Sequence, residues 1–199
     1  PGSGLHVNIS LLRDGKNLFE GELAPGSEGA HFVAGVLAHA RELTAFCNPV
    51  PNSYARLGAN EAPLYVSWSR QNRSQLVRLP SARGELCRVE LRGPDPAGNP
   101  YLAIGLILAA GLDGIQRELP LPEAVNRNLF LPSAAAGLEC LPRTLREAIT
   151  VAAQSEFISR ELPIALQNKY FQYQTLLCHG FESAPDPEAW DRANGFLII

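Results

Sequence analysis

The sequence contains no methionine, not even at its first position. A translated chain begins with methionine unless processing removes it, and here Pro1 leads almost directly into a patterned segment. We therefore expect a piece cut from a longer protein. The Gly-Ser-Gly run at residues 2–4 leaves open the alternative that the first residues are a remnant of cloning.

Other absences exclude whole classes of protein. The four cysteines lie far apart and form no C-x-x-C pair, which argues against a disulfide framework or a zinc site and fits reduced thiols in the cytoplasm. There is no apolar run of about 18 residues and no basic leader, so we expect neither a membrane span nor a secretory signal. The net charge of −3 argues against a general attraction to nucleic acid or anionic membranes.

What remains is the composition of one globular domain, with 46% apolar and 19% charged residues in 199 positions. Its most informative stretch, residues 88–92, alternates between charged and apolar residues. On a strand, Arg88, Glu90 and Arg92 would share one face. A carboxylate between two guanidinium groups stays ionised and can hold a divalent cation, while the arginines can bind anions. The alternative, which these five residues alone favour, is an ion pair on a solvated sheet face.

The N-terminal third predicts strands around one long helix. Residues 5–19 predict a hairpin that turns at Asp14-Gly15, with His6, Asn8 and Ser10 on one polar face that could line a pocket. A single histidine on a strand is more often structural. Residues 27–46 predict a helix capped by Ser27, followed by a loop rich in Pro, Gly and Asn at 48–63. Short strands are expected at 64–68 and 75–79.

Arginines crowd one third of this acidic chain, and no lysine accompanies them there. A nucleic-acid groove is one interpretation, but the negative net charge and the lack of interleaved aromatic residues argue against it. Arginine suits forked recognition of phosphate or carboxylate on a small ligand, and a solvated basic face remains open. These residues are Arg56, Arg70, Arg73, Arg78, Arg83, Arg88 and Arg92.

The C-terminal half predicts helices. Asn99-Pro100 begins one of them, and because residues 101–112 are apolar nearly all round, we expect it to be buried behind the strand at 88–92. A capping box at Thr144 opens a helix that ends near residue 154, and helices at 155–162 and 165–178 follow. The apolar tail at 196–199 needs a partner surface or is a frayed terminus.

Three ordered motifs resemble the bacterial-type glutamine synthetase family. The resemblance is to the C-terminal half of its catalytic domain, and it covers roughly residues 1–130 well and the rest weakly. The motifs are Arg88–Arg92 with Pro94-Asp95-Pro96, then Asn99-Pro100-Tyr101-Leu102, then Ala110-Gly111-Leu112-Asp113-Gly114-Ile115.

The resemblance implies an α+β fold in which an antiparallel sheet forms a ligand face and is backed by helices. Residues 1–199 would be the C-terminal part of the catalytic domain. The upstream catalytic strands, the remaining metal-binding glutamates and the small N-terminal β-domain would be absent. We therefore expect at most half of a catalytic site here, and a parent protein that is a cytoplasmic homo-oligomer.

The activity that the resemblance implies is ATP-dependent carbon–nitrogen ligation, in which ammonia attacks γ-glutamyl phosphate. It needs Mg²⁺ or Mn²⁺, with ATP as a substrate. The partners would be ATP, glutamate and ammonia or an amine, and neither nucleic acid nor a membrane. Two alternatives stay open: a γ-glutamyl-amine (polyamine) ligase, which differs in the nucleophile, and a non-catalytic module that keeps the fold.

The same motifs imply a role for individual residues. His6 and Glu90 match two ligands of one divalent ion. Glu61 matches a flap glutamate that shields the intermediate and helps to deprotonate ammonium, and with Arg73 it forms the catalytic set. The glutamate-binding positions are matched by Gly2, Arg56, Glu61 and Arg92, and the positions near ATP by Asn8, Ser10, Arg73, Arg78 and Arg88. The departures are Pro1 where asparagine is usual, Asn8 where histidine is common and Leu86 where a lysine is expected.

Overall fold

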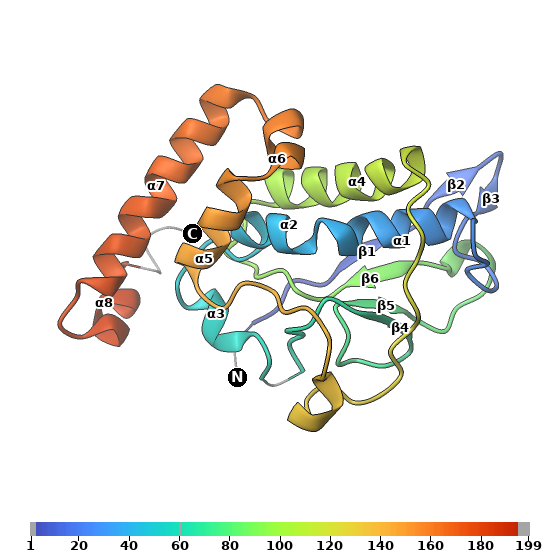
Figure 1. The fold of residues 1–199 in the computed structure, drawn as a ribbon, viewed down its shortest axis with the longest axis horizontal. Helices are drawn as coiled ribbons and strands as arrows, with labels where there is room; N and C mark the ends of the chain where they lie inside the picture. Colours follow the sequence, from blue (N-terminus) through green and yellow to red (C-terminus); the bar gives the residue numbers. More distant parts are fainter. Residues whose placement is uncertain (1–2, 60, 195–199) are drawn as a thin grey trace.

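A four-stranded sheet lies at the centre of the computed structural model, which describes residues 3–59 and 61–194. The strand order is β1-β6-β5-β4 (Figure 1). Neighbours pair antiparallel except for β5 and β4, which are parallel. The strands are β1 (Val7–Ile9), β4 (Trp68–Arg70), β5 (Val77–Leu79) and β6 (Val89–Leu91). The expected α+β class, with a sheet backed by helices, is confirmed, and the parallel pair is a departure from an all-antiparallel sheet.

The register of the sheet places the polar side chains of three strands in one row. Asn8 of β1 and Arg78 of β5 are both paired with Glu90 of β6. Because side chains alternate along a strand, the apolar residues on either side of this row point to the opposite face and join the core. These residues are Val7, Ile9, Val77, Leu79, Val89 and Leu91.

The segment predicted as one helix at 27–46 is two helices, α1 (Glu28–Ala38) and α2 (Ala40–Cys47). Ser27 caps α1 as expected, since its hydroxyl accepts a hydrogen bond from the amide of Ala30 at 3.3 Å. The chain bends at His39, whose ring stacks on Phe157 at 3.9 Å between centroids. The bend, which local periodicity does not predict, coincides with a contact from a distant part of the sequence.

The second long helix, α4 (Pro100–Gln116), packs against α1 on the side away from the sheet (Figure 1). The two backbones touch, because a methyl group added at Gly35 would lie 2.2 Å from the carbonyl oxygen of Ala110. The prediction that α4 is buried all round is wrong: Tyr101 is 89% exposed and Leu112 is 52% exposed. Helix α1 covers one face of α4, and no described residue covers these side chains.

The remaining elements surround this core. The tight turn expected at Asp14-Gly15 is present, with positive φ at both residues, but it joins only β2 (Leu12–Arg13) to β3 (Lys16–Asn17). The longer hairpin predicted at 5–19 is wrong, because β1 pairs with β6 instead. The predicted strand at 64–68 forms only a bridge from Tyr65 to Cys140 before β4 begins at Trp68. No helix among the described residues is long and apolar enough to cross a membrane. The tail at 196–199 lies outside the described residues.

Short elements and the C-terminal helices complete the chain. Thr144 caps α5 as predicted, since its hydroxyl accepts from the amide of Glu147 at 3.1 Å. The elements are β2 (Leu12–Arg13), β3 (Lys16–Asn17), α3 (Ser53–Arg56), α5 (Leu145–Ala153), α6 (Glu156–Glu161), α7 (Ile164–Glu182), α8 (Pro187–Asn194), and the 3₁₀ turns η1 (Gly84–Leu86) and η2 (Pro132–Ala135).

His39 makes the stability of the fold depend on pH. Its Nε2 lies 2.8 Å from Asp113, which also binds Arg117 and Arg160, and its Nδ1 contacts Glu42. Burial opposes charging of the ring, but the two carboxylates outweigh it and raise the pKa of His39 above its ordinary 6.5. A raised folded-state pKa contributes stability that is complete below the unfolded-state pKa and is lost as pH rises through the folded-state pKa.

We therefore expect His39→Gln to lower the free energy of unfolding by about 2 kcal/mol near pH 6 and by less as pH rises. Denaturant unfolding of both proteins across this range measures the difference. His31→Gln is the control, because His31 binds only the carbonyl of Leu119 and has no carboxylate partner among the described contacts. A difference that stays constant with pH would show that the charged ring contributes nothing.

Candidate functional site

Glu90 lies at the centre of the polar row and is 6% exposed. One carboxylate oxygen, Oε2, accepts from Arg78 Nε at 2.6 Å and from Arg92 Nη1 at 3.3 Å. Burial opposes ionisation of Glu90. The two arginines outweigh this effect through their hydrogen bonds and their charges, and they hold the pKa of Glu90 below its usual range. The other oxygen, Oε1, faces His6, whose Nδ1 is 3.3 Å away.

These contacts correct the prediction for residues 88–92. The carboxylate is held between two guanidinium groups, but they are those of Arg78 and Arg92, because Arg88 turns to Asn8. The alternative of a solvated sheet face is wrong, since Arg92 is 3% exposed. Arg78 comes from the neighbouring strand, so alternation within one strand could not identify it.

His6 and Glu90, predicted as two ligands of one cation, are brought together by the fold. Burial and the charge of Arg92 outweigh the attraction of Glu90 and lower the pKa of His6, which keeps its imidazole neutral and able to bind a metal. Neighbouring octahedral ligands about 2.1 Å from Mg²⁺ lie about 3 Å apart, so the separation of 3.3 Å fits such a pair. Across the described part of the chain no three His, Cys, Asp or Glu residues converge, so these residues do not assemble a fuller ligand set around the pair.

Arg92 connects this centre to the loop that carries Glu61. Its Nε donates to the carbonyl of Arg73 at 3.1 Å, and its Nη2 donates to the carbonyl of Glu61 at 3.2 Å. The carboxylate of Glu61 lies 3.9 Å from Arg73 Nη1, and both side chains are exposed. The predicted catalytic residues are therefore neighbours, with their backbones fixed and their side chains accessible to a ligand.

Arg56, at the end of α3, is 9% exposed and lies beside His6. Its Nη2 donates to the carbonyls of Gly93 and Pro94 and to Asn48 Oδ1 at 3.2 Å. A methyl group added at Gly4 would lie 3.3 Å from Arg56 Nη1 and 3.7 Å from His6 Nε2. Glycine at this position therefore leaves space between the guanidinium of Arg56 and the imidazole of His6.

The predicted nucleotide residues divide between two places. Arg88 Nε donates to Asn8 Oδ1 at 3.1 Å, and the hydroxyl of Ser10 donates to the carbonyl of Cys87 at 2.8 Å. Arg88 also lines an open cleft of about 470 Å³, together with Arg70 and Arg83. Arg73 and Arg78 lie instead at Glu61 and Glu90. Gly2 lies outside the described residues.

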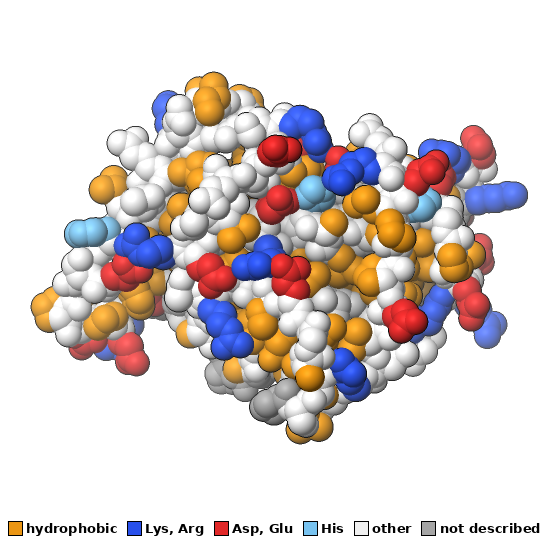
Figure 2. All heavy atoms as spheres, in the orientation of Figure 1, with side chains coloured by type: hydrophobic (Ala, Val, Ile, Leu, Met, Phe, Trp, Pro, Cys, Tyr) orange, Lys and Arg blue, Asp and Glu red, His pale blue; other side chains and the backbone are white. Residues whose placement is uncertain are grey.

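Charged side chains of both signs are interspersed on the face shown in Figure 2. Several arginines of the crowded stretch are committed to specific partners: Arg56, Arg78 and Arg92 bind within the site, and Arg70 donates to the carbonyl of Gly21 at 2.9 Å. This arrangement suits small anionic ligands better than the broad basic surface that a nucleic acid requires.

Residues 1–193 match the family model described as glutamine synthetase, catalytic domain. The chain belongs to the glutamine synthetase family. It is 43% identical over 183 residues to a glutamine synthetase of Staphylococcus epidermidis and 42% identical over 183 residues to that of Staphylococcus aureus. In both cases the match covers 88% of this chain and 41% of the relative, so the chain spans less than half the length of these glutamine synthetases.

Solved structures agree with this membership. The ADP complex of GmaS, in its first conformation, has a TM-score of 0.81 and 31% identity, over 98% of this chain and 46% of that one. Ligand-free GmaS has a TM-score of 0.80 at the same identity, over 97% of this chain and 45% of that one. The family model and both structures include the C-terminal helices, where the sequence motifs gave only a weak resemblance.

Sequence reasoning missed part of the surroundings of Arg56. Asn48 is 1% exposed and binds this arginine, yet it stands in an Asn-Pro pair that indicates only the end of a helix. The carbonyls of Gly93 and Pro94 carry no side-chain signal at all. The Pro-rich composition of residues 94–96 was the one available hint that a fixed backbone turn follows β6.

Proposed function

We propose that the protein containing this chain is an ATP-dependent carbon–nitrogen ligase that forms glutamine from glutamate and ammonia through γ-glutamyl phosphate. The observation that carries the proposal is that the two carboxylate oxygens of Glu90 have different partners. One oxygen is held by two arginines, and the other faces a neutral imidazole. A buried carboxylate prepared in this way suits a cation that must meet anionic substrates. Membership of the family supports the same reaction.

His6 and Glu90 would hold Mg²⁺ or Mn²⁺, which neutralises charge on the transferred phosphoryl group when bound. Arg56 would bind the substrate carboxylate through the N–H groups that face Gly4. Arg92 uses three of its five N–H groups on protein acceptors, and the remaining two can bind glutamate. Gly2 would contribute its backbone to the same glutamate site.

Arg73, Arg78 and Arg88 would bind the phosphates of ATP, with Asn8 and Ser10 beside the nucleotide. The ADP complex of GmaS supports nucleotide binding by this fold. Glu61 would close over the intermediate, exclude water and accept a proton from ammonium, for which an exposed carboxylate on a loop is suited.

We further propose a cytoplasmic homo-oligomer that acts on small molecules rather than on nucleic acid or membranes. Cys47, Cys87, Cys140 and Cys178 are all free thiols, which is typical of a reducing compartment. The relatives extend well beyond the length of this chain, so residues outside it would complete the site.

An assay of the full-length protein tests the proposed function. We expect phosphate release from ATP that requires glutamate and ammonia together. Methylamine in place of ammonia is the comparison, and a higher kcat/KM with methylamine would favour the γ-glutamyl-amine ligase. If neither nucleophile supports turnover, the remaining interpretation is a non-catalytic module that keeps the fold.

A further inference from the structure

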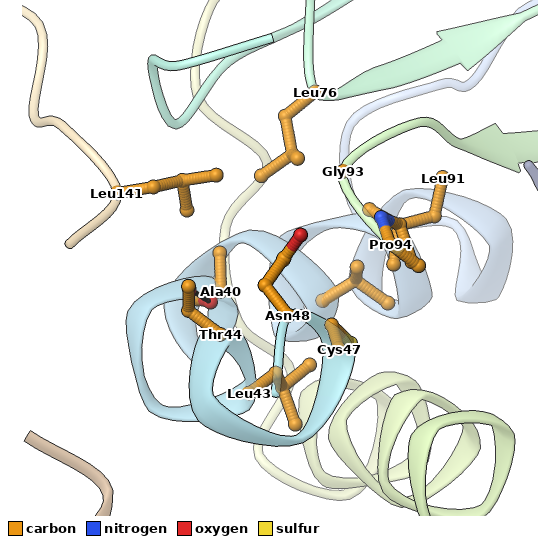
Figure 3. Close-up of a pocket in the computed structure, with 11 residues that line it drawn as sticks. Ala40, Leu43, Thr44, Cys47, Asn48, Leu76, Leu91, Gly93, Pro94 and Leu141 are labelled. Carbon is orange, nitrogen blue, oxygen red and sulfur yellow. Dashed lines mark hydrogen bonds between the residues drawn. The ribbon is translucent and has the colours of Figure 1, made fainter. Parts of the chain in front are cut away.

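We infer that Asn48 is a positioning residue that fixes the guanidinium of Arg56 for a carboxylate ligand. The inference rests on the proposed function, and it adds a residue to that site. Asn48 follows the last residue of α2 and projects into a cavity of about 20 Å³, opposite Gly93 and Pro94 (Figure 3). A cavity of this size holds about one water molecule, so it is no ligand pocket.

The three acceptors around Arg56 all meet the same nitrogen, Nη2, which has only two hydrogens. They come from two segments, the end of α2 and the turn after β6. These segments are already joined, because the amide of Asp95 donates to the carbonyl of Cys47 at 2.8 Å. Acceptors from both sides fix the plane of the guanidinium as well as the position of one nitrogen.

The three acceptors that hold Nη2 determine where the other edge of the guanidinium points. Nη1 lies next to Gly4 and His6, where the gap left by the glycine opens toward the metal-binding pair. No described residue accepts a hydrogen bond from Nη1 or from Nε, and because Nε is buried, Nη1 is the donor available to an anion. Because an amide accepts a hydrogen bond without bringing a negative charge, Asn48 holds the arginine without adding to the one carboxylate charge that acts on it, that of Asp95.

Asn48→Ala in the full-length protein is expected to raise the KM for glutamate about tenfold, as the loss of a hydrogen bond to a charged group allows. The KM for ATP should stay unchanged, because the arginines predicted for the phosphates do not contact Asn48. Val36→Ala is the matched control: Val36 lines the same cavity and does not contact Arg56. An equal rise in both variants would mean general loosening and would overturn the inference.

A double-mutant comparison separates positioning from a structural role. In an Arg56→Gln background, Asn48→Ala should cause no further rise in the KM for glutamate, whereas independent effects would multiply and contradict the inference. If the alanine variant does not fold, Asn48→Asp keeps the shape and places a charge on Arg56. A higher KM for glutamate with an unchanged KM for ATP then supports the inference, and an unchanged KM for glutamate overturns it.

The unsubstituted protein separates this inference from the proposed function. If it lacks glutamate-dependent turnover, the proposed function fails. If it is active and both Asn48 variants keep its glutamate KM, the function stands and the role of Asn48 is wrong.

Discussion

Glu90→Gln is expected to reduce the metal-activated turnover of the full-length protein at least about a hundredfold. The substitution removes the charge that would hold the cation and leaves the buried Arg92 and the half-buried Arg78 against a neutral group. Removing one preorganised electrostatic group from a catalytic site typically costs about 2.7–4 kcal/mol of transition-state stabilisation, and each 1.36 kcal/mol corresponds to about a tenfold change in rate. The apparent constant for Mg²⁺ or Mn²⁺ should rise together with the loss of turnover.

The measurement is initial velocity against metal concentration at saturating ATP and glutamate. Glu85→Gln is the control, because Glu85 lies in η1 on the same stretch of chain and its side chain is exposed. The control should keep the metal dependence of the unsubstituted protein. Metal activation that is the same in both variants would remove Glu90 from the coordination shell and leave it as a structural anchor for the arginines.

The parts of the fold that sequence predicted are those that local chemistry decides. Ser27 and Thr144 each cap a helix because a side-chain oxygen reaches an amide three residues on, whatever surrounds them. The alternation at His6, Asn8 and Ser10 places them on one face for the same reason, since the strand period fixes it.

The parts that sequence could not give depend on distant partners. The break at His39 lies where this residue binds Asp113, which is 74 positions away in the chain. The apolar composition of α4 predicts burial, but composition cannot tell how many neighbours the helix has, and Tyr101 remains exposed. The parallel pairing of β4 and β5 depends on the path of the chain between them.

In the candidate site, too, some features follow from local sequence and others depend on distant partners. Glu90 was predicted from its own strand, yet one of its two arginines, Arg78, comes from the next strand and was expected at ATP. Asn48 gave no signal, because its role exists only once α2 and the turn after β6 meet at Arg56. The residue types of a site can therefore be found from sequence when they are charged, whereas their uncharged supports depend on tertiary structure.

The 199-residue chain by itself is expected to show no synthetase activity, with turnover at least about 10⁴-fold below that of the full-length protein. Phosphoryl transfer between two anions requires cations held in fixed geometry, because alignment and charge neutralisation supply most of the catalysis. The described residues offer two ligands for one ion, His6 and Glu90, and no second carboxylate cluster. Weak binding of nucleotide should persist through Arg73, Arg78 and Arg88, since arginines recognise phosphate without the metal.

Phosphate release that depends on both glutamate and ammonia, measured on the purified chain beside the full-length protein, tests this expectation. The chain carrying Glu90→Gln supplies the background, because any activity it shares with the unsubstituted chain comes from contaminants or from chemistry outside the proposed site. Nucleotide binding is followed separately by titration with ADP, which shows that an inactive chain is still folded. Turnover above the Glu90→Gln background would contradict the expectation. It would mean that His6 and Glu90 suffice to hold the cation, and that any other catalytic residues lie within this chain, although the described geometry does not place them together.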